Sequence, residues 1–415
     1  MIEHLCREFA IDTAVRDAAI RARDRVRDVR YPCTGMVKIA MLRAFYDARI
    51  SDSELNGTSG YGYDDAARTA YESLLAKIFG VDRALARISI VSGTHAIIAA
   101  LSACVGPGER CISVAGRPYD TLRNAICGAP DSLVERGMSY EEVELCDDGT
   151  VDIEAVRRSL RERAVRAVFV QRSRGYAPRR SIDIEACSRI FAAVRETSPQ
   201  TLILVDNCYG ELVEAREPTH VGADLVMGSL IKNLGGSLAP AGGYVAGSAA
   251  LVDRVASRLY APGLGTALGP TLGYGRAFIQ GLFLAPLVIE QVLRGLDFSA
   301  ALFSELGYYV DPAPGARRTD IVQAIRLGNA ELVKRFAEGL QQAMPLNARF
   351  RPEPGRVPGY PDPVIMSGGA FVAGATIELS CDAPMREPYE VYLQGGIVAE
   401  HAFLGALLAA QCVAA

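Results

Sequence analysis

Between about residue 66 and residue 250, the sequence alternates between helical patterns and short apolar stretches. The predicted helices cover residues 66–80, 92–105, 118–128, 151–163 and 181–196. The predicted strands cover residues 86–91, 111–115, 166–171, 201–206, 223–229 and 242–247. Apolar strands that alternate with helices are typical of a doubly wound, mostly parallel sheet with helices on both faces. We therefore expect an α/β fold.

The sequence predicts three regions. Residues 1–60 mix charged and apolar residues at helical spacing and end in a loop, so we expect an N-terminal helical arm. Residues 61–300 hold the α/β pattern and form the predicted large domain. Residues 301–415 carry proline clusters, strand-like runs at 319–327 and 374–380, and a closing helix at 400–410, which predict a smaller α+β domain. Half of the 415 residues are hydrophobic, enough for a large core.

Composition excludes several classes of function. The net charge is −4 and no basic block stands out, so nucleic acid is not an expected partner. No apolar run approaches the roughly 20 residues of a membrane span, and residues 1–28 lack the apolar core of a signal peptide. Ten cysteines without a CxxC pair and four histidines without ligand spacing indicate a cytoplasmic protein with no metal site.

Two sets of polar residues stand at predicted strand ends, where doubly wound sheets bind ligands. Ser92, Gly93 and Thr94 lie between a strand and a helix, so their backbone N–H groups can hold a phosphate. The alternative is a plain helix cap. Asp206 ends the strand 201–206 and can pair with a cation, such as a protonated pyridine nitrogen, or cap the next turn.

The third feature is Lys232, which follows the strand 223–229 and its last residue, Ser229. Only four of the 44 basic residues are lysines, and this one stands among small residues. A lysine in a desolvated pocket has a lowered pKa and can act as an amine nucleophile. The alternative is a lysine that binds phosphate or reaches solvent. In this order, the three features together predict a pyridoxal 5'-phosphate (PLP) site.

The sequence that carries these residues resembles a known family, the bacterial methionine γ-lyase-like or aluminium-resistance proteins. The motifs that carry the resemblance are SGTHAI, GRPYDT, QRSRGY, VDNCYGE, GADLVMGSLIKN and LAPAGGYVAG, followed by RTDIVQAI, IELS and YLQGG. It runs from about residue 56 to the C-terminus. This family is a branch of the fold type I PLP enzymes, so the resemblance implies a PLP-binding large domain and a smaller C-terminal domain.

The resemblance also implies roles for individual residues. Lys232 looks like the Schiff-base lysine, Asp206 the partner of the pyridinium nitrogen, and Tyr119 a ring-stacking acid or base. The implied phosphate ligands are Ser92, Gly93, Thr94 and Ser229. Tyr63 and Arg68 resemble a loop that reaches the cofactor of a neighbouring subunit, which implies a homodimer or homotetramer with shared active sites. For His95 three positions are open: beside the cofactor ring, at the cap of its helix, or packed in the core.

Related lyases bind the substrate carboxylate with an arginine in a strand of the small domain, but the corresponding stretch TIELSCD has none. Arg172, Arg174 and Arg386 are the candidates, because a planar guanidinium suits a carboxylate.

The resulting hypothesis is a PLP-dependent lyase that eliminates a sulfur or halide leaving group from an L-amino acid. The γ-carbon is the preferred position of the leaving group. One variant would eliminate chloride from a chlorinated, unsaturated amino acid and give a terminal alkyne. A PLP aminotransferase or racemase would use the same core residues. From another class, a non-catalytic metal-stress protein is the alternative, although no cluster of carboxylates favours it.

Overall fold

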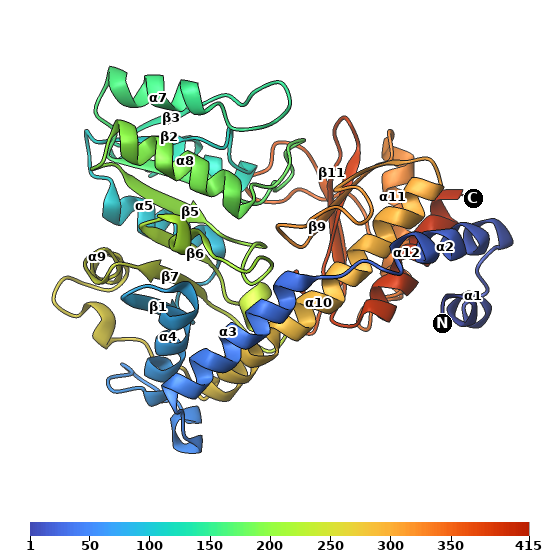
Figure 1. Cartoon of the computed structure of the whole chain (residues 1–415), viewed down its shortest axis with the longest axis horizontal. Helices are drawn as coiled ribbons and strands as arrows, with labels where there is room; N and C mark the ends of the chain where they lie inside the picture. Colours follow the sequence, from blue (N-terminus) through green and yellow to red (C-terminus); the bar gives the residue numbers. More distant parts are fainter. Residues whose placement is uncertain (415) are drawn as a thin grey trace.

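A computed structural model describes residues 1–414, and its larger sheet has seven strands (Figure 1). In spatial order these are β1 (Arg83–Arg87), β7 (Gly243–Gly247), β6 (Leu225–Ser229), β5 (Leu202–Asp206), β4 (Ala167–Gln171), β2 (Arg110–Ser113) and β3 (Ser139–Glu142). From β6 to β3 all neighbours are parallel, whereas β7 runs antiparallel to β1 and to β6. The predicted α/β class is therefore confirmed.

Helices pack against both faces of this sheet, and most begin at a polar cap. They are α4 (Ala66–Phe79), α5 (Gly93–Cys104), α6 (Asp120–Arg123), α7 (Ile153–Glu162), α8 (Ile184–Thr197) and α9 (Ala249–Leu259). The side chains of Asp65, Asp152 and Asp183 accept backbone N–H groups in the first turns of α4, α7 and α8. Strands β4, β5 and β6 are buried on both faces, which explains their continuous apolar sequences.

One strand lies earlier than predicted. The predicted segment 86–91 forms a strand only up to Arg87, and β1 begins at Arg83. Arg83 and Arg87 hide the apolar pattern that would predict this strand. Arg87 is nevertheless buried, because it pairs with Glu72. Ile90, beyond the strand, lies against Gly243, where an added Cβ would approach the isoleucine side chain to 2.5 Å.

The second sheet has five antiparallel strands in the order β10 (Val364–Gly368), β11 (Ser380–Pro384), β12 (Glu390–Gln394), β9 (Val322–Arg326) and β8 (Tyr309–Asp311). Helices α11 (Ala330–Gln342) and α12 (Ala399–Ala414) complete this part. The predicted strand 374–380 is wrong, because β11 begins only at Ser380. Before it, the carboxylate of Glu378 accepts the N–H groups of Phe371 and Val372 and holds the segment in a loop.

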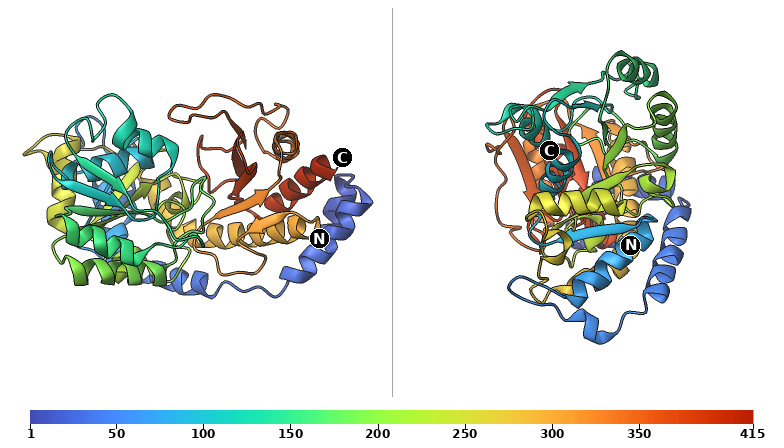
Figure 2. Two further views of the ribbon diagram at one scale, coloured as in Figure 1. Left: turned by 90° about the horizontal axis from the view of Figure 1, so that it is seen from above. Right: turned by 90° about the vertical axis from the view of Figure 1, so that its left-hand side faces the viewer.

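Helix α10 (Gly275–Glu305) connects the two sheets, and the predicted domain boundary at residue 300 lies inside it. Of the N-terminal helices, α2 (Thr13–Val26) packs against α10 and α12, α3 (Pro32–Ala48) packs against α10, and α1 (Ile2–Glu8) packs against α2 and α12. In Figure 2 the N-terminal segment lies beside the C-terminus. Contrary to the sequence-based expectation, α10 is long and apolar enough to span a membrane by length and composition. It packs against α2, α3 and α12, and 56% of its most apolar window is buried, so it serves as a core helix.

Candidate active site

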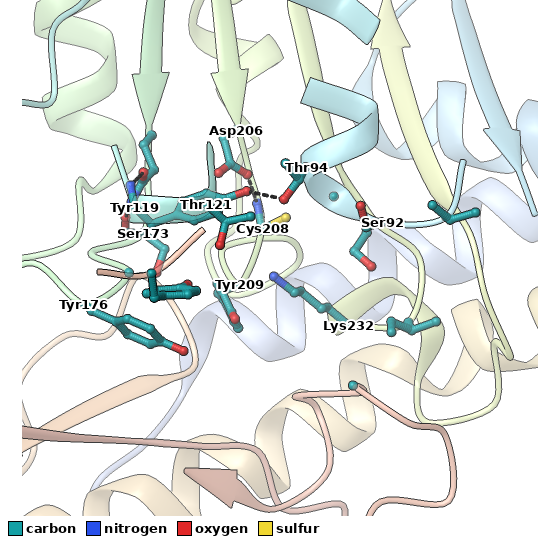
Figure 3. A pocket seen from close by; sticks show the side chains of 18 residues that line it. Ser92, Thr94, Tyr119, Thr121, Ser173, Tyr176, Asp206, Cys208, Tyr209 and Lys232 are labelled. Atoms are coloured by element: carbon teal, nitrogen blue, oxygen red, sulfur yellow. Dashed lines mark hydrogen bonds between the residues drawn. The ribbon is translucent and has the colours of Figure 1, made fainter. Parts of the chain in front are cut away.

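A cavity of about 290 Å³ opens at the carboxyl ends of β4, β5 and β6 (Figure 3). Its walls come from the larger sheet and its loops, with Tyr360 and Gly374 added from the region of the second sheet. Seven residues predicted from the sequence line it together: Ser92, Gly93, Thr94, Tyr119, Asp206, Ser229 and Lys232. The topology brings them together because parallel strands direct their carboxyl ends to one edge.

The first wall of the cavity is the N-terminus of α5. Ser92 caps the helix, since its Oγ accepts the N–H of His95 at 3.1 Å, and it also lines the cavity. The helix cap is therefore confirmed, and the phosphate-binding role stays a prediction. Gly93 leaves space that a side chain would fill, because an added Cβ would lie 3.0 Å from Sγ of Cys208. The ring of His95 accepts the N–H of Val91 at 3.3 Å and is not part of the cavity wall, so it supports the cap.

Asp206 stands at the tip of β5 with its side chain facing the cavity (Figure 3). Its Oδ1 accepts the N–H of Cys208 at 3.1 Å, and within residues 1–414 the carboxylate otherwise accepts only from the thiol of Cys208, a weak donor. Burial raises the pKa of this carboxyl, and the cations of Lys232 and Arg179 oppose that shift. A buried carboxylate with so few donors can accept a proton-bearing cationic nitrogen.

Lys232 follows β6, and its amine points into the cavity. Its Nζ lies 3.7 Å from the centre of the Tyr209 ring, a cation–π contact. Tyr209 has a φ of 71°, which is unusual for an aromatic residue and typical of functional sites. Burial alone would lower the pKa of Lys232, but the groups around it, Cys208, Tyr209 and Asp206 among them, outweigh burial and raise it. The lowered pKa expected from the sequence is therefore wrong.

Tyr119 forms the opposite wall. Its hydroxyl shares a hydrogen bond of 2.8 Å with Oγ1 of Thr94, and its backbone N–H donates to Oε1 of Gln171 at 3.0 Å. Burial and the Asp206 charge raise the pKa of Tyr119 well above its ordinary value. The phenol therefore keeps its proton at neutral pH and can donate a hydrogen bond.

Two predicted cofactor residues lie outside this cavity. The Tyr63 side chain is half exposed on the loop before α4. Arg68 is buried, and its NH1 donates to the carbonyls of Gly62 and Gly269 at 2.6 and 2.9 Å, so it fixes the loop that carries Tyr63. Neither side chain reaches the cavity of its own chain.

The three candidate arginines also lie outside the cavity wall. Arg172 is fully buried and binds Glu214, Asn207 and a backbone carbonyl. These contacts give it a structural role. Arg174 is buried and pairs with Asp311 at 2.5 Å. Because both guanidinium groups are engaged away from the cavity, the structure does not place them to bind a substrate carboxylate.

Arg386 is different, because its side chain is partly exposed. It bridges Asp120, next to Tyr119, at 3.2 Å and Asp362, near Tyr360, at 3.1 Å. Both neighbours, Tyr119 and Tyr360, line the cavity.

Sequence reasoning missed several cavity residues: Thr121, Gln171, Ser173, Tyr176, Cys208, Tyr209 and Tyr360. Gln171 ends β4 and therefore shows the same signal that identified Asp206, a polar residue at the tip of an apolar strand. Cys208 and Tyr209 directly follow Asp206 in the chain. Tyr360 lies in a proline-rich loop that gave no such signal, because only the tertiary fold brings it to the cavity.

The chemistry of these donors fits PLP. The free N–H groups and hydroxyls at the start of α5 suit its phosphate, the Asp206 carboxylate suits its ring nitrogen, and Lys232 suits its aldehyde. The space at Gly93 lets an anion approach the helix backbone. No group of three or more His, Cys, Asp or Glu side chains suited to a metal ion occurs in the part of the chain that the structure describes.

Comparison with known proteins gives three informative matches and one family. A family model described as methionine gamma-lyase matches residues 20–414. A solved structure from Clostridium acetobutylicum, described as a candidate cystathionine beta-lyase involved in aluminium resistance, is 39% identical. Its TM-score is 0.94, and the match covers 99% of this chain and 98% of that one. The Bacillus subtilis protein YnbB is 40% identical over 365 residues, which are 87% of this chain and 86% of YnbB.

A more distant structure supports the fold alone. The pyridoxal-5'-phosphate-dependent protein YhfS from Escherichia coli is 18% identical, with a TM-score of 0.62 over 90% of this chain and 94% of YhfS. The predicted fold type I architecture is therefore confirmed.

Proposed function

Because this chain belongs to the methionine gamma-lyase family of PLP-dependent carbon–sulfur lyases, we propose that it eliminates a leaving group from the γ-carbon of an L-amino acid. One observation carries the proposal. A single cavity holds the Lys232 amine, the Asp206 carboxylate and the Tyr119 phenol together with the N-terminus of α5. This set contains a proton carrier, a fixed charge, an acid and an anion site, which are the groups that elimination needs.

Each of these residues would have a separate role in the proposed elimination. When bound, PLP supplies the sink for electrons released at the substrate's α-carbon. Asp206 would pair with the ring nitrogen of PLP and keep it protonated. In its neutral form the Lys232 amine would take the proton from the substrate's α-carbon, and it would have to pass that proton on before it could take one from the β-carbon. Tyr119, whose phenol is protonated at neutral pH, would donate a proton to the leaving group.

We propose that Arg386 binds the substrate carboxylate. It is the one of the three candidate arginines with a partly exposed guanidinium, and its aspartate partners stand next to residues of the cavity wall. Exchange of an aspartate for a substrate carboxylate keeps a charge-assisted contact.

We also propose that the active unit is at least a homodimer. The outer face of α3 exposes Met36, Ile39, Leu42 and Tyr46, and α10 exposes Phe283 and Leu287. Monomeric proteins rarely expose contiguous apolar surface of this kind, and a second copy of the chain would cover it. The exposed Tyr63 would then be free to approach the partner's cavity.

We also propose a cytoplasmic location, which ten free cysteines support.

The test is a substrate panel. Purified protein loaded with PLP is mixed with methionine, cystathionine, homocysteine, cysteine or γ-chloroallylglycine, and released keto acid, thiol and halide are measured. The proposal expects release of thiol or halide from a γ-substituted member. Release from cysteine alone would show β-elimination, and amino-group transfer without a leaving group would show an aminotransferase. Either result would overturn γ-elimination.

A further inference from the structure

Arg179 is a buried cation without a carboxylate partner in the described part of the chain. It lies in the loop after β4, with 4% of its surface exposed. Burial and the like charge of Arg174 lower its pKa to about 10, so it still carries its charge at neutral pH. Its Nε is buried without a hydrogen bond. An unpaired charge in the interior is costly, so a buried arginine of this kind calls for an explanation.

The remaining nitrogens of Arg179 bind only backbone carbonyl oxygens. NH2 donates to the carbonyls of Gln171 at 2.7 Å and Ser173 at 2.8 Å, and NH1 donates to that of Arg180 at 2.9 Å. A planar guanidinium can hold three carbonyls in fixed positions, which a lysine ammonium does less well. The guanidinium therefore closes the chain into a turn directly after the tip of β4.

This turn supports the wall of the cavity. The Gln171 side chain donates from Nε2 to the carbonyl of Ser173 at 2.9 Å and accepts the backbone N–H of Tyr119 at Oε1, at 3.0 Å. Gly175 allows its loop to pack closely against Gln171 and Tyr119, since an added Cβ would lie 3.1 Å from Gln171 Nε2 and 3.4 Å from Cβ of Tyr119. Two hydrogen bonds in series thus connect Arg179 to Tyr119.

We propose that Arg179 is a positioning residue that fixes Tyr119 in the wall of the cavity through Gln171. The inference rests on the proposed PLP site, which Arg179 itself does not line. Its guanidinium fixes the backbone of Gln171 and Ser173, the Gln171 amide then has one orientation, and that amide holds the backbone of Tyr119. The charge needs no ionic partner because the carbonyl dipoles of the turn solvate it.

The test compares Arg179→Met, Gln171→Ala and the double variant with the wild-type protein. The measurements are the PLP dissociation constant, the visible circular dichroism of bound PLP, which reports how rigidly its ring is held, and the thermal unfolding midpoint. Arg180→Met is the matched control, because the neighbouring Arg180 side chain is 84% exposed. Gln171→Ala leaves the buried charge in place and so keeps the test valid if Arg179→Met does not fold.

We expect each single variant to weaken PLP binding about tenfold, the effect of losing one strong hydrogen bond, and to reduce the visible dichroism. The double variant should be no worse than the weaker-binding single variant, because both residues act through one connection. Arg180→Met should match the wild type. Wild-type dichroism and affinity in Gln171→Ala, or fully additive losses in the double variant, would overturn the inference. A wild-type protein that binds no PLP would instead refute the proposed function.

Discussion

At the scale of single residues, the site combines groups whose charges depend on one another. Asp206 and Lys232 face the same cavity, and each alters the protonation of the other. The sequence indicated both residues because each follows an apolar strand. The direction of the Lys232 pKa shift could not be predicted from the sequence, because it depends on side chains such as Tyr209 that only the fold places around the amine.

Arg386→Ala should raise the KM for the amino-acid substrate and change kcat less. Loss of a charge-assisted hydrogen bond worth about 2 kcal/mol corresponds to about a 30-fold higher KM. Steady-state kinetics checks this, with Arg326→Ala as the control, since Arg326 is similarly exposed and pairs with Glu390 on the same sheet. An unchanged KM in Arg386→Ala would remove Arg386 from substrate recognition.

Glu211 predicts a pH dependence of stability. It is fully buried behind the cavity, where burial raises its pKa to about 8 from an ordinary value of 4.5. Between these values the native state binds more protons than the unfolded state, so the free energy of unfolding falls as pH rises. The Glu211→Gln variant keeps an acceptor for the Tyr244 hydroxyl. Its free energy of unfolding should fall less between pH 6 and pH 9 than that of the wild-type protein. Urea unfolding at both pH values measures this, and equal losses in the two proteins would refute it.

At the scale of elements, the cavity depends on where strands end and helices begin. The ends of β4, β5 and β6 and the start of α5 were predictable, because apolar runs, a glycine and a capping serine mark them in the sequence. The segments that the sequence misplaced carry polar residues in buried positions. Arg87 in β1 is neutralised by Glu72, and Glu378 binds backbone N–H groups in a loop. Pairing of this kind is tertiary and leaves no local pattern.

The start of α5 supplies a prediction at this scale. Gly93→Ala should weaken PLP binding, because the new Cβ would lie 3.0 Å from Sγ of Cys208 and occupy space beside the helix N-terminus. Alanine favours helices over glycine, so the fold should remain. Equilibrium titration with PLP measures the effect, and Gly355→Ala, whose Cβ would meet nothing within 4 Å, is the control. Wild-type PLP affinity in Gly93→Ala would show that the phosphate lies elsewhere.

At the scale of the whole molecule, α10 makes the two sheets one structure. It extends from the larger sheet to the helices beside the second sheet and packs against α2, α3 and α12 (Figure 1). The second sheet and its loops close the cavity with Tyr360 and Gly374. A change of sequence texture near residue 300 was visible, but a helix that crosses the boundary was not, because its apolar residues belong to both parts.

The apolar face of α3 predicts the assembly. Leu42→Glu places a charge on this face, where the leucine is 56% exposed in the single chain. If a second copy covers the face, the variant should shift toward monomers and lose activity with it. Analytical ultracentrifugation measures the mass, and Val134→Glu is the control, since Val134 is an exposed apolar residue elsewhere on the surface. A wild-type protein that is monomeric at micromolar concentration would contradict the proposed dimer.

The most direct test of the central claim, that Lys232 is the residue that carries PLP, is chemical labelling. Purified protein with PLP is reduced with sodium borohydride, digested, and the labelled peptide is identified by mass spectrometry. The chain has only three other lysines, Lys38, Lys77 and Lys334, so the result is unambiguous. We predict a label on Lys232 alone and none in Lys232→Ala, which should also lose the visible absorption band. A label on another lysine, or a visible band that persists in Lys232→Ala, would contradict the account.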